Sequence, residues 1–333
     1  MSFCRAYLPK VRDRLVRELA SGRVDLDDVL LQPLQSEGKL MRPRLVLLSA
    51  ALFGLIDDSV IGTAVAVECI HTASLVHDDI IDRAFLRRGV PTLSSLKGPE
   101  IAVLAGDHYF ATAFNILSQL RQTDVLGELT RAIRDMCQGE IRQNLNLFNC
   151  DLTENEYYEN IYGKTASLFG AACRAGAMAV CASPDDVRAI GSFGENLGYA
   201  YQIIDDVIDL IGDEEKMGKP AGSDLRSGVI TLPVIWALKT LKHRQLLVDI
   251  ISGRKIENAE INQVTGIIVE SGAIDHALNI SREKLDEASR IVRSFNSGSI
   301  GMELMDLCMA VIDLPTAAGC GAHMGGAEMM VEV

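Results

Sequence analysis

Helical periodicity runs through nearly the whole chain and restricts it to an all-helical fold. Apolar residues recur at the three- and four-residue spacing of an α-helix, whereas alternating segments bounded by turn residues are almost absent. We expect helices near residues 5–21, 42–54, 58–83, 99–121, 123–147, 153–181, 183–211, 229–241 and, with breaks, 257–312. The small-residue segment 315–333 is expected to be a flexible C-terminal tail.

Composition and charge narrow the class of protein. The 333 residues are 48% hydrophobic, which is ample for a large buried core, and the net charge of -13 argues against nucleic-acid binding. The eight cysteines include no CxxC pair, as in a reduced cytosolic protein. The longest apolar run, Leu45–Ile56, is shorter than the roughly 20 residues that span a bilayer. We therefore expect a cytoplasmic protein with at most peripheral membrane contact.

The first feature that indicates chemistry is an aspartate cluster at the end of an apolar helix. The segment VIGTAVAVECIHTASLVHDDIID is apolar nearly all round, which is typical of a buried helix, yet it closes with Asp78, Asp79 and Asp82. Asp78 and Asp82 are four residues apart and so share a helix face. Carboxylates in such a place need partners, because burial of an unpaired charge is very costly.

A second cluster repeats the arrangement 127 residues later (205 - 78 = 127). Asp205, Asp206 and Asp209 form another DDxxD on a mostly apolar helix. Two such clusters facing each other would form a bowl of negative charge. Magnesium prefers oxygen ligands and is usually completed by substrate phosphates. The pair of clusters therefore predicts a site for magnesium and a diphosphate, with all six aspartates as candidate metal residues.

Other metal and nucleotide sites fit less well. A ferritin-like di-iron site needs two Glu-x-x-His motifs, and only Glu68–His71 matches. HExxH is absent, and so is a Walker A motif, since Lys219 is followed by Pro220.

Diphosphates also require cations, and the chain carries them in groups near the aspartate clusters. Arginine forks onto phosphate oxygens, whereas lysine acts as a point charge. His71 lies two helical turns before Asp78, where a core role and a diphosphate contact are both open. The candidate cations are Lys39, Arg42, Arg87, Arg88, Lys164 and Lys219.

The motifs, taken in order, resemble those of the farnesyl, geranylgeranyl and polyprenyl diphosphate synthases, the trans-isoprenyl diphosphate synthase family. They are GKLMRPR, HTASLVHDDIIDRAFLRRGVPT, LAGDHYF, YGKTASLF, YQIIDDVIDLIGD, MGKPAGSDL and TLP, and they cover most of the chain from Gly38 to Leu238. One departure is Val229, where many relatives carry lysine. The resemblance implies a single large helical bundle of the isoprenoid synthase type over residues 1–314, with a central cavity, usually as a homodimer.

The resemblance also assigns roles to residues. It implies that Asp78, Asp82 and Asp205 are the main magnesium ligands, with the other three aspartates supporting them, and that several Mg²⁺ ions bind with the allylic diphosphate. Isopentenyl diphosphate would be bound by Lys39, Arg42, His71 and Arg88. The allylic diphosphate would be bound by Arg87, Lys164, Thr165, Gln202 and Lys219. The catalytic set would then be Asp78, Asp82, Asp205, Lys164 and Lys219.

The expected reaction joins these two substrates head to tail. The allylic diphosphate leaves, the double bond of isopentenyl diphosphate adds to the allylic cation, and a proton is lost. Ala73 and Ser74 lie about one turn before Asp78, at a level that an aromatic residue blocks in short-product relatives. Because both are small, we expect a product longer than geranylgeranyl diphosphate, made from a farnesyl or geranylgeranyl primer.

Several alternatives remain at this stage. The chain could be a short-chain synthase, or the catalytic subunit of a two-component enzyme that needs a small second subunit. A terpene cyclase usually lacks a second DDxxD and the Lys39, Arg42 and His71 set. A non-catalytic regulatory subunit would be expected to lose one of the clusters.

Overall fold

Helices make up most of the structure, a computed structural model that describes residues 3–36, 38–213, 221–239, 243–254, 256–295 and 298–320. In these ranges the strands form one antiparallel hairpin, β1 (Leu86–Arg87) with β2 (Val90–Pro91). The all-α prediction is therefore confirmed.

The predicted helices are present with limits close to the predicted ones, although two of them are only eight residues long. They are α1 (Cys4–Leu19), α3 (Met41–Phe53), α4 (Asp58–Ile81), α6 (Pro99–Gln119), α7 (Thr123–Leu145), α8 (Glu154–Ile161), α9 (Ser167–Ala179), α10 (Pro184–Ile211), α13 (Leu232–Lys239), α15 (Asn258–Glu270), α16 (Ala273–Ser294) and α17 (Gly298–Ile312). A π-helical turn, η2 (Tyr162–Ala166), joins α8 to α9.

Several other short helices lie outside the predicted segments, since four to nine residues alone display little of a helical period. They are α2 (Val24–Leu30), the 3₁₀ turn η1 (Gln32–Gln35), α5 (Leu93–Lys97), α12 (Ser223–Ser227), α14 (Arg244–Ser252) and α18 (Leu314–Ala317). The segment predicted to be a flexible tail also differs at its start. Residues 315–317 belong to α18, and Cys320 is fully buried, whereas residues 321–333 lie outside the described residues.

The chain falls into two compact units that alternate along the sequence. Unit 1 comprises Met1–Arg134, Ser167–Glu195 and Arg290–Met305, and unit 2 comprises Asp135–Ala166, Asn196–Ser289 and Asp306–Val333. Each unit is described below by itself.

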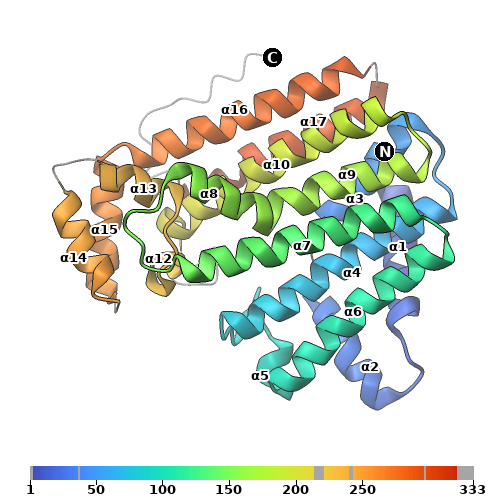
Figure 1. The fold of residues 1–333 in the computed structure, drawn as a ribbon, viewed down its shortest axis with the longest axis horizontal. Helices are drawn as coiled ribbons and strands as arrows, with labels where there is room; N and C mark the ends of the chain where they lie inside the picture. Colours follow the sequence, from blue (N-terminus) through green and yellow to red (C-terminus); the bar gives the residue numbers. More distant parts are fainter. Residues whose placement is uncertain are drawn as a thin grey trace. The chain divides into compact units, whose positions relative to one another are not determined.

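The core of unit 1 is built around α4, which packs against α1, α3, α6 and α9, while α3 packs along α9 (Figure 1). Ala64, Val65, Ala66 and Val67 are four successive residues of α4 with no exposed surface. A helix that is apolar on every side can be covered in this way only at the centre of a bundle. Among the described helices, α4 alone is long and apolar enough to span a membrane, and 78% of that stretch is buried within the protein, as in a core helix.

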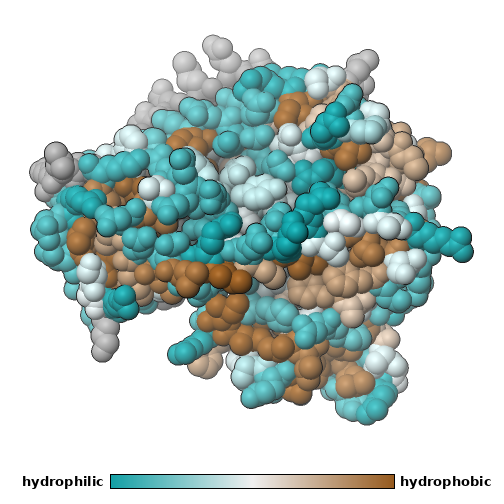
Figure 2. Space-filling view, in the orientation of Figure 1, coloured by the Kyte–Doolittle hydropathy of each residue, from teal (hydrophilic) through white to brown (hydrophobic). Residues whose placement is uncertain are grey.

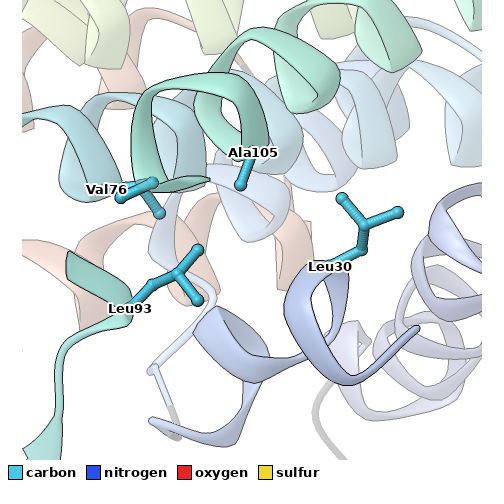
Figure 3. Close-up of a cluster of buried hydrophobic side chains, with 5 residues drawn as sticks. Leu30, Val76, Leu93 and Ala105 are labelled. Atoms are coloured by element: carbon cyan, nitrogen blue, oxygen red, sulfur yellow. The ribbon is translucent and has the colours of Figure 1, made fainter. Parts of the chain in front are cut away.

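A smaller apolar cluster fixes the region where α4 ends. Leu30 from α2, Val76 from α4, Leu93 from α5 and Ala105 from α6 converge there, with at most 8% of any side chain exposed (Figure 3). Burial of these side chains holds the hairpin and α5 against the last turns of α4.

Unit 2 packs its own core around α13. Leu232, Val234 and Ala237 have no exposed surface, and α13 contacts α8, α14 and α15. Trp236 stacks on His276 of α16, with ring centroids 3.6 Å apart. These contacts fix the start of α13, which directly follows residues 229–231 in the wall of a cavity of unit 2.

Candidate active site

The first aspartate cluster lies in the last turn of α4. Asp57 caps the start of the helix, and its carboxylate accepts hydrogen bonds from the backbone N–H groups of Ser59 and Val60. Asp82 caps the other end, just after Ile81, and is exposed, while Asp78 is partly exposed. Asp79 differs from both, since only 6% of it is exposed.

Asp79 forms an ion pair with Arg87. Its Oδ1 accepts a hydrogen bond from Nε of the arginine at 2.8 Å, and Nη2 lies 2.8 Å from the same oxygen. Burial raises the pKa of the Asp79 carboxyl, and the Arg87 guanidinium opposes that effect. Asp79 is thus a buried partner of Arg87, whereas Asp78 and Asp82 reach the surface.

The β1–β2 hairpin places Arg87 and Arg88. Arg87 pairs with Val90, so Arg88 and Gly89 form a two-residue loop, with φ values of 51° and 77°. Positive φ at both positions is the type I′ turn that suits a two-residue hairpin. Arg88 at its tip is exposed.

Arg42 and His71 form a second polar group in unit 1. Arg42 Nη1 lies 2.9 Å from His71 Nε2, and the guanidinium lies 4.7 Å from the centroid of the Phe169 ring. Burial and the neighbouring Arg42 and Arg88 charges lower the pKa of His71 well below its usual value. The imidazole is therefore neutral and accepts a hydrogen bond from Arg42.

The other two residues predicted for isopentenyl diphosphate lie close to this pair. A Cβ added at Gly38 would lie 3.2 Å from Nη1 of Arg88, so the bare glycine lets Arg88 approach the loop before α3. Lys39, next in the chain, is exposed. The structure thus brings Lys39, Arg42, His71 and Arg88 into one region of unit 1.

The second aspartate cluster lies inside α10 and is mostly buried. Asp205 is exposed, but Asp206 is 3% and Asp209 is 2% exposed. Both oxygens of Asp206 accept hydrogen bonds, from the Tyr157 hydroxyl at 2.6 Å and from Gln202 Nε2 at 2.8 Å. Burial raises the pKa of Asp206, with a smaller contribution from the Asp224 charge.

Asp209 is held by the short helix α12. Its carboxylate accepts hydrogen bonds from the Ser223 hydroxyl and, at 3.0 Å, from the backbone N–H of Asp224. The first turn of a helix leaves N–H groups without intrahelical partners, and a carboxylate satisfies them well. Asp209 therefore anchors α12 to α10.

The π-helical turn η2 directs the side chains of Lys164 and Thr165 toward different partners. Gly163 meets Gly139 of α7 so closely that an added Cβ would lie 2.7 Å from the Gly139 Cα. Lys164 Nζ lies 3.5 Å from Gln143 Oε1, whereas the Thr165 hydroxyl donates to Gln202 Oε1 at 2.6 Å. Extra residues in a helical turn often occur at functional sites, because they redirect side chains.

Lys164, Gln202 and Asp206 line one cavity in unit 2. Its walls include Gln143, Lys164, Gln202, Asp206, Asp224, Val229 and Thr231. The Thr231 hydroxyl is buried and has no hydrogen-bond partner among the described residues. Thr165, Gln202, Asp206 and Tyr157 form a continuous chain of hydrogen bonds beside this cavity.

The two residues predicted to set product length differ in exposure. Ala73 has no exposed surface, whereas Ser74 is partly exposed and donates its hydroxyl to the His71 carbonyl at 2.8 Å. Lys219, predicted for the allylic diphosphate, lies outside the described residues.

Comparison with known proteins decides the family. The polyprenyl synthetase family model matches residues 24–268. The chain belongs to the polyprenyl synthetase family. The chain is 36% identical over 311 residues to heptaprenyl diphosphate synthase component 2 of Geobacillus stearothermophilus, covering 93% of this chain and 96% of that one. It is 35% identical to solanesyl diphosphate synthase 1, chloroplastic, of Arabidopsis thaliana, covering 91% of this chain and 75% of that one.

Solved structures agree with the polyprenyl synthetase assignment. A polyprenyl synthase from Caulobacter crescentus, complexed with calcium and isoprenyl diphosphate, superimposes with a TM-score of 0.88 at 31% identity, over 92% of this chain and 94% of that one. The resemblance and the prenyltransferase class expected from the sequence are confirmed. The roles of individual residues stay predictions.

Sequence reasoning missed residues that support this polyprenyl synthetase site. Tyr157 bonds Asp206, and Ser223 bonds Asp209, across 49 and 14 residues of chain. Tyr157 lies seven residues, or two helical turns, before Lys164. This spacing places both residues on one side of a helix, and it is the feature of the sequence that could have pointed to Tyr157. Glu68, three residues before His71, is 8% exposed, and burial raises the pKa of its carboxyl to about 7.

Proposed function

We propose that the chain is a magnesium-dependent trans-polyprenyl diphosphate synthase whose product is longer than geranylgeranyl diphosphate. It would extend a farnesyl or geranylgeranyl diphosphate primer with isopentenyl diphosphate. The observation that supports this best is the presence of surface carboxylates in both DDxxD motifs, Asp78 and Asp82 in one and Asp205 in the other.

The carboxylates fit magnesium. In the described part of the chain, no three His, Cys, Asp or Glu side chains gather into a ready metal site. Magnesium is usually held by one or two carboxylates, with substrate phosphates and water completing its shell, so a pair such as Asp78 and Asp82 suffices. When bound, the ions neutralise the charge that develops on the departing diphosphate. Asp79, Asp206 and Asp209 would support the ligands through their own hydrogen bonds.

Arg42 and His71 would bind isopentenyl diphosphate, together with Lys39 and Arg88. The neutral imidazole fixes the guanidinium by accepting from Nη1, and the Phe169 ring supports it from one side. An arginine held in this way is already ordered before a phosphate binds.

The allylic diphosphate would be bound by Lys164, Arg87 and Lys219, as the sequence motifs suggest. Gln202 lines the cavity in unit 2 together with Lys164, and Thr165 donates a hydrogen bond to Gln202. Gln202 uses one N–H on Asp206, which leaves a second N–H for a phosphate oxygen. These donors would stabilise the diphosphate as it leaves.

Two other readings have specific support. Relatives that are named component 2 favour a second, different subunit for this chain as an alternative to a homodimer. A relative from Methanothermobacter thermautotrophicus that is named short chain isoprenyl diphosphate synthase is 38% identical over 261 residues, which favours a short product. The small side chains of Ala73 and Ser74, one turn before Asp78, are our reason for preferring the long product. We place the enzyme in the cytoplasm.

The test is to incubate the purified chain with labelled isopentenyl diphosphate and farnesyl diphosphate, with and without magnesium, and to size the products. We expect a magnesium-dependent series of products, each about five carbons longer than the one before, whose longest member exceeds about twenty carbons. A series that stops at fifteen or twenty carbons would keep the chemistry and refute the long product. Absence of product that is restored by a second subunit would favour the two-component enzyme.

Product length has its own test in Ser74→Tyr and Ala73→Tyr. Each should shorten the product, because an aromatic ring would occupy the level one turn from Asp78. Unchanged product length in both variants would refute the role of these positions.

A further inference from the structure

Glu68 is a buried acidic residue in the core helix α4. Hydrophilic side chains cover much of the face of the protein in Figure 2, but only 8% of Glu68 is exposed, and its neighbours Val67 and Cys69 have no exposed surface. Its Oε2 atom is buried and has no hydrogen-bond partner among the described residues. A charged carboxylate in such a place is costly, and an unsatisfied buried oxygen requires a physical reason.

The carboxyl group lies beside the Arg42–His71 pair. His71 follows Glu68 by three residues, so the two side chains are neighbours on one face of α4. Arg42 Nη1 lies 2.9 Å from His71 Nε2, which brings the guanidinium to the same face. The positive charges of Arg42 and Arg88 both act on the Glu68 carboxyl. Glu68 therefore shares its surroundings with three of the four residues that are candidates for binding isopentenyl diphosphate.

Two opposing effects leave the Glu68 carboxyl close to its titration point at neutral pH. Burial raises its pKa from 4.5 to about 7, and the charges of Arg42 and Arg88 oppose that rise. A carboxyl with this pKa is about half protonated near pH 7. A further negative charge brought close to it would favour the protonated form.

The other titratable groups around Glu68 keep one charge state near neutral pH. They are Arg42 on α3, Arg88 in the hairpin loop, His71 and Cys69 on α4, and Tyr109 on α6. Burial raises the pKa of Cys69 and of Tyr109 and lowers that of His71, so these three side chains stay neutral. Both arginines stay charged. Glu68 is the member of this group whose charge can respond to a ligand.

The helices α1 and α9 also pack against α4, and their charges are engaged in pairs of their own. Glu18 of α1, which acts on Cys69, is paired with Arg14 at 3.2 Å. Arg174 of α9 is paired with Glu128 and, at 2.7 Å, with Glu195.

We propose that isopentenyl diphosphate binds at this site together with a proton, which the Glu68 carboxylate takes up. The inference rests on the proposed function, since it assigns a regulation to the diphosphate site of Arg42 and His71. The diphosphate brings negative charge to the arginines beside Glu68, so it offsets the field that keeps the carboxylate ionised. By thermodynamic reciprocity, a ligand that raises the proton affinity of Glu68 binds more tightly to the protonated protein.

Glu68 acts here as a positioning residue rather than a catalytic one, because it works through the charge of Arg42 and Arg88. When Glu68 is protonated, both guanidinium charges remain available to the diphosphate. When it is ionised, it cancels part of that charge. The affinity for isopentenyl diphosphate therefore falls as pH rises through the pKa of Glu68 in the free protein, whereas the step that joins the bound substrates is unaffected.

Steady-state kinetics tests the proposal with Glu68→Gln, which is neutral at every pH and close in size to the protonated residue. With the allylic substrate saturating, the KM for isopentenyl diphosphate should rise about fivefold more in the unaltered chain than in the variant between about pH 6 and 8. The ratio of the two KM values removes the titration of the substrate itself, and kcat should keep one pH profile. Glu100→Gln, at an exposed glutamate of α6, is the matched control and should follow the unaltered chain.

Calorimetry counts the proton directly and depends neither on catalysis nor on a variant. Isopentenyl diphosphate is titrated into the full-length chain near neutral pH in two buffers that differ in ionisation enthalpy. We expect the unaltered chain to take up about half a proton on binding, and Glu68→Gln to take up almost none.

Stability separates this role from a purely structural one. The pKa of Glu68 is about 7 in the folded chain against 4.5 for an ordinary glutamate, so the folded state binds more protons and unfolding free energy falls as pH rises through this range. Glu68→Gln lacks that loss, so its advantage in urea midpoint over the unaltered chain should grow from about pH 6 to 8. A carboxylate that stabilised the fold through an ion pair would make the variant the less stable chain.

Two results would overturn the inference: a KM ratio that stays constant over this pH range, or the absence of proton uptake by the unaltered chain. Prenyl transfer with a constant KM ratio would refute the inference alone. A chain that neither binds isopentenyl diphosphate nor transfers prenyl groups would refute the proposed function, and the inference with it.

Discussion

The two DDxxD motifs have the same sequence pattern but different environments. In the first motif one aspartate of three is buried, and a charged partner, Arg87, satisfies it. In the second motif two of three are buried, and neutral donors satisfy them: Tyr157 and Gln202 for Asp206, Ser223 and a backbone N–H for Asp209.

The position of each motif in its helix explains the difference. α4 ends at Ile81, so the third aspartate, Asp82, falls at the helix end and reaches the surface. α10 continues to Ile211, so Asp209 remains within the helix and is covered by α12. The first motif therefore has two accessible aspartates and one buried aspartate. The second motif has one accessible aspartate and two buried ones.

The largest loss of activity is expected when an accessible carboxylate is replaced. Asp78→Asn, Asp82→Asn and Asp205→Asn should each lower kcat/KM by about a thousandfold, because each removes charge that would hold magnesium and the leaving diphosphate. The free energy of unfolding should change by less than about 0.5 kcal/mol. Initial rates over a magnesium titration and urea unfolding measure the two quantities.

Asp13→Asn is the matched control for these variants, since Asp13 is exposed on α1. The division into accessible and buried roles would be wrong if Asp206→Asn matched Asp205→Asn in lost activity while keeping full stability.

The helical period of the apolar residues predicted most of the helices, and both DDxxD motifs are visible in the sequence itself. The burial and the hydrogen-bond partners of each aspartate could not be predicted. Whether Asp79 or Asp82 is buried depends on the residue at which α4 ends, a limit that sequence patterns place only approximately. The partners of Asp206 and Asp209 are Tyr157, on another helix, and Ser223, on a helix too short to show a period. Lys164 and Thr165 are adjacent in sequence, yet the π-helical turn sends them to different partners.

The next effect in size concerns the charged partner in the first motif. Arg87→Met should leave Asp79 as a buried carboxylate without its cation and lower the free energy of unfolding by about 2–3 kcal/mol. Arg83→Met is the control, because Arg83 is exposed and belongs to the same loop region. Equal urea midpoints for the two variants would show that the ion pair contributes no stability, and the first motif would then need no charged support.

A smaller loss is expected for a neutral donor in the second motif. Tyr157→Phe removes one of the two side-chain hydrogen bonds to Asp206 and leaves a buried acceptor, which should cost about 1–2 kcal/mol of unfolding free energy. Tyr158→Phe is the matched control, because Tyr158 is the next residue of the same helix and is only partly buried. If Tyr157→Phe cost more than Arg87→Met, the neutral support would be the stronger of the two, and the comparison would be reversed.

The smallest effect is expected where Asp209 holds α12. Ser223→Ala removes the hydroxyl donor to Asp209 but keeps the backbone N–H of Asp224, so the loss should be about 0.5–1 kcal/mol. Ser227→Ala, at the exposed other end of the same five-residue helix, is the control and should be nearly neutral. Amide hydrogen exchange in residues 223–227 measures the local change directly, since loss of the anchor should speed exchange there first. Slower activity without faster exchange would instead place Ser223 in contact with substrate, and Asp209 would then belong with the accessible carboxylates rather than with the buried ones.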